Sequence, residues 1–214
     1  MVKRSSAALA DDLTLAVAWL ALIASPVTLF VGHLGAVGLD WRKNQVSTYA
    51  AKAPNDDWVT ATMLLAAVAL VGIAVNLHRA LAADLISRAL STLLGAGAAG
   101  LVLLACFEVG GGYRQGKHDA GLVLFLIATT AAFAVAGGAI AVTGPGWRQR
   151  VAGTFVAGCA LGGTGSLEVN WTPLWGLHQR TAFLGLWVAA LFLLGIVSSV
   201  GRRNSKGARD EQRP

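Results

Sequence analysis

Residues 90–119, LSTLLGAGAAGLVLLACFEVGGGYRQGKHD, decide the fold. No charged side chain occurs between Leu90 and Phe107, and Glu108 then ends the apolar run. A glycine-rich segment follows, and His118 and Asp119 close the stretch. An apolar run of about twenty residues matches the thickness of the hydrocarbon core of a bilayer. The stretch therefore predicts a transmembrane helix that ends in an acid and leads to a second helix, which opens with a His–Asp pair.

Five more runs of similar length give six candidate spans, at roughly residues 13–34, 58–77, 90–109, 120–142, 151–169 and 181–200. The chain is 55% hydrophobic and only 13% charged, which lies outside the usual composition of soluble proteins. The runs lack the alternation of barrel strands, and helices satisfy their own backbone groups in lipid. We therefore predict an all-α bundle of six transmembrane helices with antiparallel neighbours. Residues 1–200 form the bundle, and residues 201–214 form a basic, disordered cytoplasmic tail.

The placement of basic residues predicts the orientation of the bundle. The net charge is +6, and eleven of the 17 lysines and arginines lie at the N-terminus, in the second and fourth connections and in the C-terminal segment. By the positive-inside rule, both termini are then cytoplasmic. The basic tail faces anionic lipids rather than nucleic acid.

Small residues recur at helical spacing and predict close helix contacts. The pairs are Gly95 with Ala99, Ala96 with Gly100, and Gly158 with Gly162. We interpret them as packing seams within one chain, with a homo-oligomer interface as the alternative. Pro26 is expected to interrupt the hydrogen bonding of the first helix, with Ser25 and Thr28 satisfying the freed backbone. The two cysteines, Cys106 and Cys159, are expected to be free thiols.

An internal repeat relates two parts of the chain. When the chain is shifted by sixty residues, EVGGGYRQGKHD falls on EVNWTPLWGLHQ. The four matches pair Glu108 with Glu168, Val109 with Val169, Gly116 with Gly176, and His118 with His178. We interpret the third and fourth helices, and the fifth and sixth, as related hairpins.

The topology places the ionisable residues of both hairpins at the outer face. Ionisable groups at membrane depth are costly and normally pair inside the bundle or face a wet cavity. We therefore predict an outward-facing polar pocket, whose candidates are His33, Asn44, Ser47, Glu108, His118, Asp119, Glu168, His178 and Arg180.

Three roles suit such a cluster. In the first role, which is structural, Glu168 pairs with Arg180, Glu108 pairs with Arg114 or Lys117, and Asp119 caps the fourth helix. In the second, a metal such as zinc takes nitrogen and oxygen ligands from His33, His118, His178, Glu108 and Glu168. The chain has no HExxH, HxxxH or CxxC motif, and we expect no cofactor, with a divalent metal as the alternative. In the third, a buried glutamate carries protons or acts on a substrate.

The first outer segment, residues 35–57, is polar and long enough to cover the outer mouth. Its hydroxyl and amide residues are Asn44, Gln45, Ser47, Thr48 and Tyr49. One interpretation is recognition of a lipid headgroup or sugar, and the other is a role in turns and helix caps. No Gly-x-Ser-x-Gly sequence surrounds Ser47, which argues against a lipase nucleophile.

Three motifs in this order resemble a known family. They are Asn-x-x-Ser after the first helix (Asn44 to Ser47), a His at the start of the fourth (His118), and Gly-Leu-x-Gln-Arg at the start of the sixth (Gly176 to Arg180). With six spans, they resemble the bacterial membrane proteins grouped as domain of unknown function 998. Gln45 stands where that family often has proline, and Cys106-Phe107-Glu108 replaces an expected Phe-Pro-containing turn. The resemblance implies the fold and assigns no catalytic residue.

The expected function is binding of a lipid or an envelope-related small molecule in the outward-facing pocket, with membrane lipids as partners. A metal-assisted lipid hydrolase is one alternative, and a small proton-coupled transporter is another. The sequence leaves open whether the protein is an enzyme.

Overall fold

The computed structural model describes residues 6–81, 85–107, 112–168 and 174–210, and the side chains of 12–81, 85–107, 115–167 and 174–199. All regular structure in these residues is helical, so the all-α prediction is confirmed. In chain order the elements are α1 (Ser6–His33), α2 (Val46–Lys52), α3 (Asp56–Ala80), α4 (Leu85–Cys106), α5 (Gly112–Thr143), α6 (Trp147–Gly165), the 3-10 turn η1 (Ser166–Glu168) and α7 (Trp175–Asp210).

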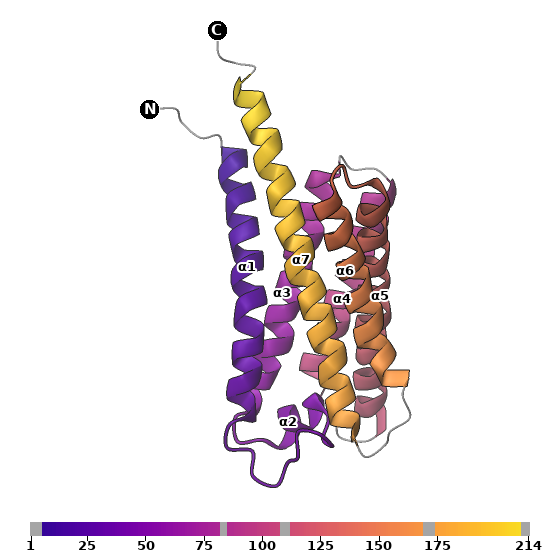
Figure 1. The fold of residues 1–214 in the computed structure, drawn as a ribbon. Coiled ribbons are helices and arrows are strands. Elements are labelled where there is room, and N and C mark those ends of the chain that lie inside the picture. The colour runs from indigo at the N-terminus through magenta and orange to yellow at the C-terminus, as the bar shows by residue number, and fades with distance from the viewer. Residues whose placement is uncertain (1–5, 82–84, 108–111, 169–173, 211–214) are drawn as a thin grey trace.

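The six long helices form one bundle (Figure 1). Each packs against the next long helix along the chain, and α7 closes the bundle by also contacting α1, α3 and α5. The start of α1 and the end of α7 lie at one end of the bundle, which we call the terminal end. The short helix α2 lies at the opposite end, called here the α2 end, together with the last turn of α1 and the first turn of α7.

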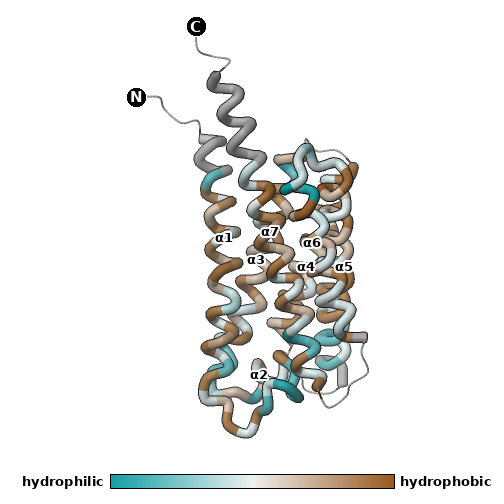
Figure 2. The backbone as a smooth tube through the Cα atoms, in the orientation of Figure 1, coloured by the Kyte–Doolittle hydropathy of each residue, from teal (hydrophilic) through white to brown (hydrophobic). Residues whose placement is uncertain are grey.

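Five helices are long and apolar enough to cross a membrane, judged by length and composition within the described residues. They are Asp12–His33, Asp56–Ala80, Leu85–Cys106, Gln115–Thr143 and Trp175–Ser199. Figure 2 shows hydrophobic residues along the middle of the helices and many hydrophilic residues near the α2 end. The membrane character is therefore confirmed. The expected count of six spans is supported for five only, because α6 combines glycines and threonines with Arg148 and Arg150 and falls short of the same measure.

Glycines bring neighbouring helices into backbone contact at three places. A Cβ on Gly100 of α4 would lie 2.6 Å from the carbonyl oxygen of Gly121 on α5. Gly137 of α5 faces Gly153 of α6 in the same way, and Gly163 of α6 faces Gly185 of α7.

The expected packing seams are therefore only partly correct. Gly100 lies at a helix contact, but a Cβ on Gly95, Gly158 or Gly162 would meet nothing within 4 Å. In helices as rich in small residues as α4 and α6, several glycines have suitable spacing. Spacing alone cannot tell which of them faces the neighbouring helix.

Pro26 links α1 to α7. The proline lies inside α1 and has no N–H to donate to the carbonyl of Leu22. Two side chains bond that carbonyl instead: Ser25 Oγ donates to it at 3.2 Å, as the sequence predicted, and Trp187 Nε1 of α7 donates to it at 2.7 Å. Thr28 does not share this role as expected, because its hydroxyl bonds the carbonyls of Ala24 and Ser25. The interruption in α1 thus fixes the lateral position of α7.

Candidate functional site

Arg180 is the centre of a hydrogen-bonded cluster at the α2 end. Its Nη1 donates to the backbone carbonyls of Asn44, at 2.8 Å, and Gly176, at 2.9 Å. Its Nη2 lies 2.6 Å from His33 Nε2, and the guanidinium carbon lies 5.1 Å from the centre of the Tyr49 ring. We call Arg180, His33, Asn44, Tyr49 and Gly176 the Arg180 cluster. It joins α1, the segment around α2, and α7.

The contacts of His33 fix its tautomer. Nδ1 lies 2.6 Å from the carbonyl oxygen of Leu29, which can only accept, so Nδ1 carries the proton. Nε2 faces a guanidinium N–H, which can only donate, so Nε2 has a free lone pair. His33 is thus neutral in this arrangement, and its ring packs 4.1 Å from the ring of Tyr49.

The segment between α1 and α3 folds onto the start of α7. It leaves α1 through Gly35 and Gly38, whose φ angles of +74° and +83° favour glycine. Leu177 N then donates to the carbonyl of Arg42 at 2.9 Å. A side chain at Gly176 has no space, because a Cβ there would collide with the carbonyl oxygens of Asn44 and Trp41. Glycine at position 176 therefore allows α7 to approach this backbone.

Gln179 caps α2 from a distance. The helix has no side-chain cap of its own, and the first N–H groups of a helix lack partners within it. Gln179 Oε1 accepts the hydrogen bond of Val46 N at 2.7 Å, and both residues are buried. The start of α7 therefore completes the short helix that covers the α2 end.

A central cavity of about 230 Å³ lies between the helices and ends at Arg180. Apolar side chains of α1, α3, α4, α5 and α7 form most of its wall, including Leu22, Leu29, Met63, Leu70, Leu101, Leu104, Phe125, Phe133, Phe183, Leu186, Trp187 and Ala190. Thr129 also lines it, and its buried hydroxyl has no hydrogen-bond partner among the described residues. The site is therefore a long apolar space with a cation at one end and a hydroxyl group in its wall.

Two groups near the cluster have shifted pKa values. Burial raises the pKa of the Tyr49 phenol above its ordinary value, although the charge of Arg180 acts in the opposite direction. The backbone N–H of Arg42 donates to Asp40 at 2.9 Å and lowers the pKa of that carboxyl, with the side chains of Arg42 and Lys43 adding to the effect.

Of the residues expected in the polar pocket, His33, Asn44 and Arg180 lie together in the Arg180 cluster. Ser47 is close by in α2, where it is buried, and its hydroxyl lies 3.4 Å from Gln45 Oε1. The side chains of Glu108 and Glu168 lie outside the described residues. The expected pairs of Glu168 with Arg180 and of Glu108 with a basic residue therefore stay predictions.

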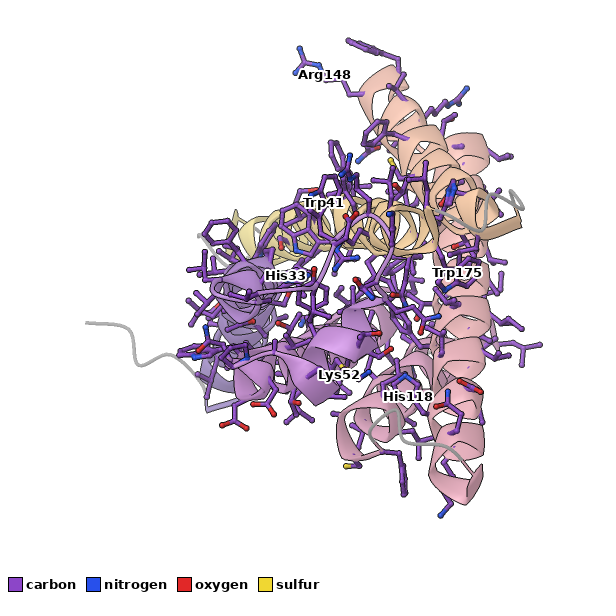
Figure 3. All side chains as sticks on the ribbon, turned by 90° about the horizontal axis from the view of Figure 1, so that it is seen from below. His33, Trp41, Lys52, His118, Arg148 and Trp175 are labelled. Atoms are coloured by element: carbon purple, nitrogen blue, oxygen red, sulfur yellow. The ribbon has the colours of Figure 1, made fainter. Side chains whose placement is uncertain are left out.

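The two histidines of the internal repeat, His118 and His178, lie outside the Arg180 cluster. His118 is buried, and its Nδ1 lies 2.7 Å from the carbonyl of Phe107 at the end of α4. Seen from the α2 end in Figure 3, α2 lies between His33 and His118. His178 Nε2 is buried without a hydrogen-bond partner among the described residues. Within the described part of the chain, neither histidine side chain makes a hydrogen bond or ring contact with the Arg180 cluster.

Asp119 does not cap the helix that follows it. Helix α5 begins at Gly112, so Asp119 lies inside it and accepts a hydrogen bond from Gln115 Nε2 at 2.7 Å. The helix starts earlier than expected, because residues 112–117, which precede the His–Asp pair, belong to it. Asp119 is exposed and makes no contact with the cluster.

The described residues contain no group of three or more His, Cys, Asp or Glu side chains close enough to hold a metal ion. The side chains of Glu108 and Glu168 lie outside that set, and the zinc alternative stays a prediction. Cys106 and Cys159 are free thiols, as predicted.

Sequence reasoning missed the roles of Gln179, Trp187 and Thr129. Gln179 and Gly176 belong to the Gly-Leu-x-Gln-Arg motif, so the motif singled out both residues. No periodicity in the sequence indicated that Gln179 caps α2. No local pattern marks Trp187 or Thr129, because both face other helices at positions where any apolar residue would suit the span.

The five apolar helices define a multi-pass membrane protein. A family model described as a protein of unknown function, DUF998, matches residues 14–197, and the chain therefore belongs to this family. The resemblance carried by Asn44–Ser47, His118 and Gly176–Arg180 is confirmed. Comparison with curated proteins and with solved structures gave no significant match.

Proposed function

We propose that the protein is a six-span bacterial inner-membrane protein that binds a lipid or an envelope-related small molecule in the central cavity. Its α2 end faces outward, and both termini lie in the cytoplasm. Arg79, Arg88, Arg148 and Arg150 flank the helices at the terminal end, which supports this orientation by the positive-inside rule.

The sixth span in this proposal is α6. Its 19 residues would extend about 28 Å at 1.5 Å per residue, close to the thickness of a hydrocarbon core. Gly153 and Gly163 pack it tightly against α5 and α7, and both of those helices meet the length and composition of a span. A helix packed against two spans is best placed in the membrane with them.

Cysteine accessibility tests the orientation. In a background with Cys106 and Cys159 replaced by alanine, single cysteines at Lys52 and Gly116 probe the α2 end, and one at Arg148 probes the terminal end. All three positions are exposed. An impermeant thiol reagent added to intact cells should label positions 52 and 116 and should label position 148 only after lysis. Labelling of position 148 in intact cells would contradict this orientation.

The central cavity is the observation that carries the binding function. Apolar cavities of about this size stay dry and accept apolar molecules, because filling them restores lost dispersion contacts. The cavity here has a volume of about 230 Å³ and a wall formed largely by leucine, phenylalanine and alanine. An amphiphile with an apolar chain matches this wall better than a soluble polar metabolite does.

Retention of an amphiphile by the purified protein tests binding. Ala190 and Ala66 line the cavity, whereas Ala120 is exposed on α5, so Ala190→Phe and Ala66→Phe fill the space and Ala120→Phe is the matched control. Mass spectrometry of organic extracts should find an amphiphile retained by the wild type and by Ala120→Phe. It should be depleted in both cavity variants at unchanged thermal stability. Equal retention by all four proteins, or retention by none, would count against the function.

A further inference from the structure

The hydrogen bonds of Arg180 leave part of its guanidinium group for another acceptor. A guanidinium has five N–H donors, and the contacts with Asn44, Gly176 and His33 use three of them. Within the described part of the chain, the Nε–H and one N–H of Nη2 have no hydrogen-bond acceptor. These two nitrogens are neighbours, and they can present a planar fork of the kind that binds carboxylate and phosphate.

The partners of Arg180 in the described residues are also all neutral. They are two backbone carbonyls, the aromatic ring of Tyr49 and an imidazole that accepts with its unprotonated nitrogen. These groups orient the guanidinium but do not cancel its charge. A half-buried cation at the end of an apolar cavity attracts an anion more strongly than an exposed one, because the surroundings screen it less.

The shape of the cavity sets the rest of the ligand. Both Arg180 and Ala190 line it, and ten residues of helix α7 extend over about 15 Å at 1.5 Å per residue. Lining residues spread over that length suit an extended hydrocarbon chain. Ser25, Thr62 and Thr129 add hydroxyl groups to a largely apolar wall, and of these only the Thr129 hydroxyl is buried without a hydrogen-bond partner among the described residues.

The cavity reaches the side of the bundle. Leu184 lines it and is nevertheless 59% exposed, and Pro26 and Leu29, also in the lining, are half-buried. Leu184 belongs to α7 and the other two belong to α1, so the opening lies between these helices. In a membrane this opening faces lipid chains and not water, which favours a ligand supplied by the bilayer.

From these contacts we infer that the central cavity binds a single-chain anionic amphiphile, with its carboxylate or phosphate on the Arg180 fork and its chain directed toward Ala190. This inference rests on the proposed function and specifies its ligand class. The shared chemistry is one anionic group on one chain, and the test separates a membrane amphiphile from a free anion.

The test measures equilibrium binding of tritiated hexadecanoate to the full-length protein in lipid nanodiscs, with empty nanodiscs as background. Hexadecyl phosphate should compete with it about as well as unlabelled hexadecanoate. Hexadecanol, which has the chain without the charge, should compete roughly tenfold more weakly or worse, since a hydrogen bond to a charged group is lost. Inorganic phosphate should not compete.

Arg180→Gln should lower the affinity for hexadecanoate roughly tenfold or more and leave hexadecanol nearly unchanged. Arg180→Lys keeps the charge without the fork, so its affinity for hexadecanoate should lie between those of the wild type and Arg180→Gln. Arg42→Gln is the matched control, because Arg42 is an exposed arginine at the same end of the bundle. If Arg180→Gln does not fold, the comparison of competitors on the wild type decides alone.

If hexadecanol competes as strongly as hexadecanoate, the ligand does not need an anionic headgroup. The proposed function would then still hold. Competition by inorganic phosphate at the same strength would overturn the amphiphile in favour of a free anion. If no hexadecanoate binds specifically while extracts still contain a retained amphiphile, this inference alone fails. Extracts without any amphiphile would remove the proposed function as well.

Discussion

His33 Nε2 lies 2.6 Å from Arg180 Nη2, so the last residue of α1 accepts a hydrogen bond from the first turns of α7. The two residues are 147 positions apart in the chain. The contact closes the α2 end of the bundle, and it depends on a neutral imidazole whose other nitrogen is held by Leu29.

We expect His33→Ala to destabilise the protein by about 1–3 kcal/mol, because it leaves a half-buried guanidinium N–H without its acceptor. His33→Gln offers a carbonyl oxygen in place of Nε2 and should recover part of the loss. Thermal unfolding in detergent measures both effects, with the exposed Asp57→Asn as the control. Identical melting temperatures for His33→Ala and the wild type would show that the contact contributes nothing.

Gly176→Ala and Gly116→Ala are a matched pair, since the internal repeat aligns the two positions. A Cβ at position 176 would collide with backbone oxygens of Asn44 and Trp41, whereas a Cβ at position 116 would meet nothing within 4 Å. We expect Gly176→Ala to cost about 1–3 kcal/mol through overpacking. Gly116→Ala should be neutral or stabilising by up to about 1 kcal/mol, because alanine favours helix over glycine. Chemical unfolding measures the difference, and a smaller cost at position 176 than at 116 would contradict the close approach of α7.

Trp187→Phe should destabilise by about 1–2 kcal/mol, since it removes the shorter of the two hydrogen bonds to the Leu22 carbonyl. In a Pro26→Ala background, residue 26 regains an N–H for that carbonyl, and the same substitution should cost less. A double-mutant cycle on unfolding free energies isolates this coupling. The exposed Trp58→Phe controls for general loss of indole. Additive effects would show that the proline and the indole act independently.

The raised pKa of Tyr49 predicts how stability depends on pH. A buried phenol stays neutral in the folded protein at pH values where the unfolded chain, with a tyrosine pKa of about 10, already ionises. Its contribution is therefore complete below about pH 10 and is lost as the pH rises through the folded pKa. The chain has two tyrosines, so Tyr113→Phe leaves Tyr49 as the one phenol to follow by absorbance. A midpoint that is the same in native and denatured protein would contradict the burial effect.

Hydropathy and short motifs predicted the helical class, the membrane character and the family. They did so because a span is recognised by length and apolarity alone, and both are local properties of the sequence. The same rule explains the difference at α6, whose glycines and threonines lower its hydropathy while they improve its packing. Helix starts were less predictable. Gly112 and Gly116, which precede His118, belong to α5, although glycine disfavours helix.

The sequence could predict the candidate site only for side chains whose free energy in lipid is high enough to decide where they lie. His33 and Arg180 are expensive in lipid, and this is why the sequence could place them at one end of the bundle. Their pairing with each other, and the role of Gln179, depend on how α2 folds back onto α7, and residues 46–52 are too few to show a period. The cavity was not predictable at all, because a void depends on which side chains from five helices fail to meet.

The distant cap on α2 also sets an order of events during synthesis. Residues 46–52 leave the ribosome long before Gln179, so the short helix lacks the acceptor for its first N–H until the last span has been made. The covering segment and the guanidinium group it surrounds are therefore assembled only at the end of membrane insertion. In any chain that stops before α7, the α2 end would lack its α7 partners and would be exposed to the quality-control proteases of the membrane.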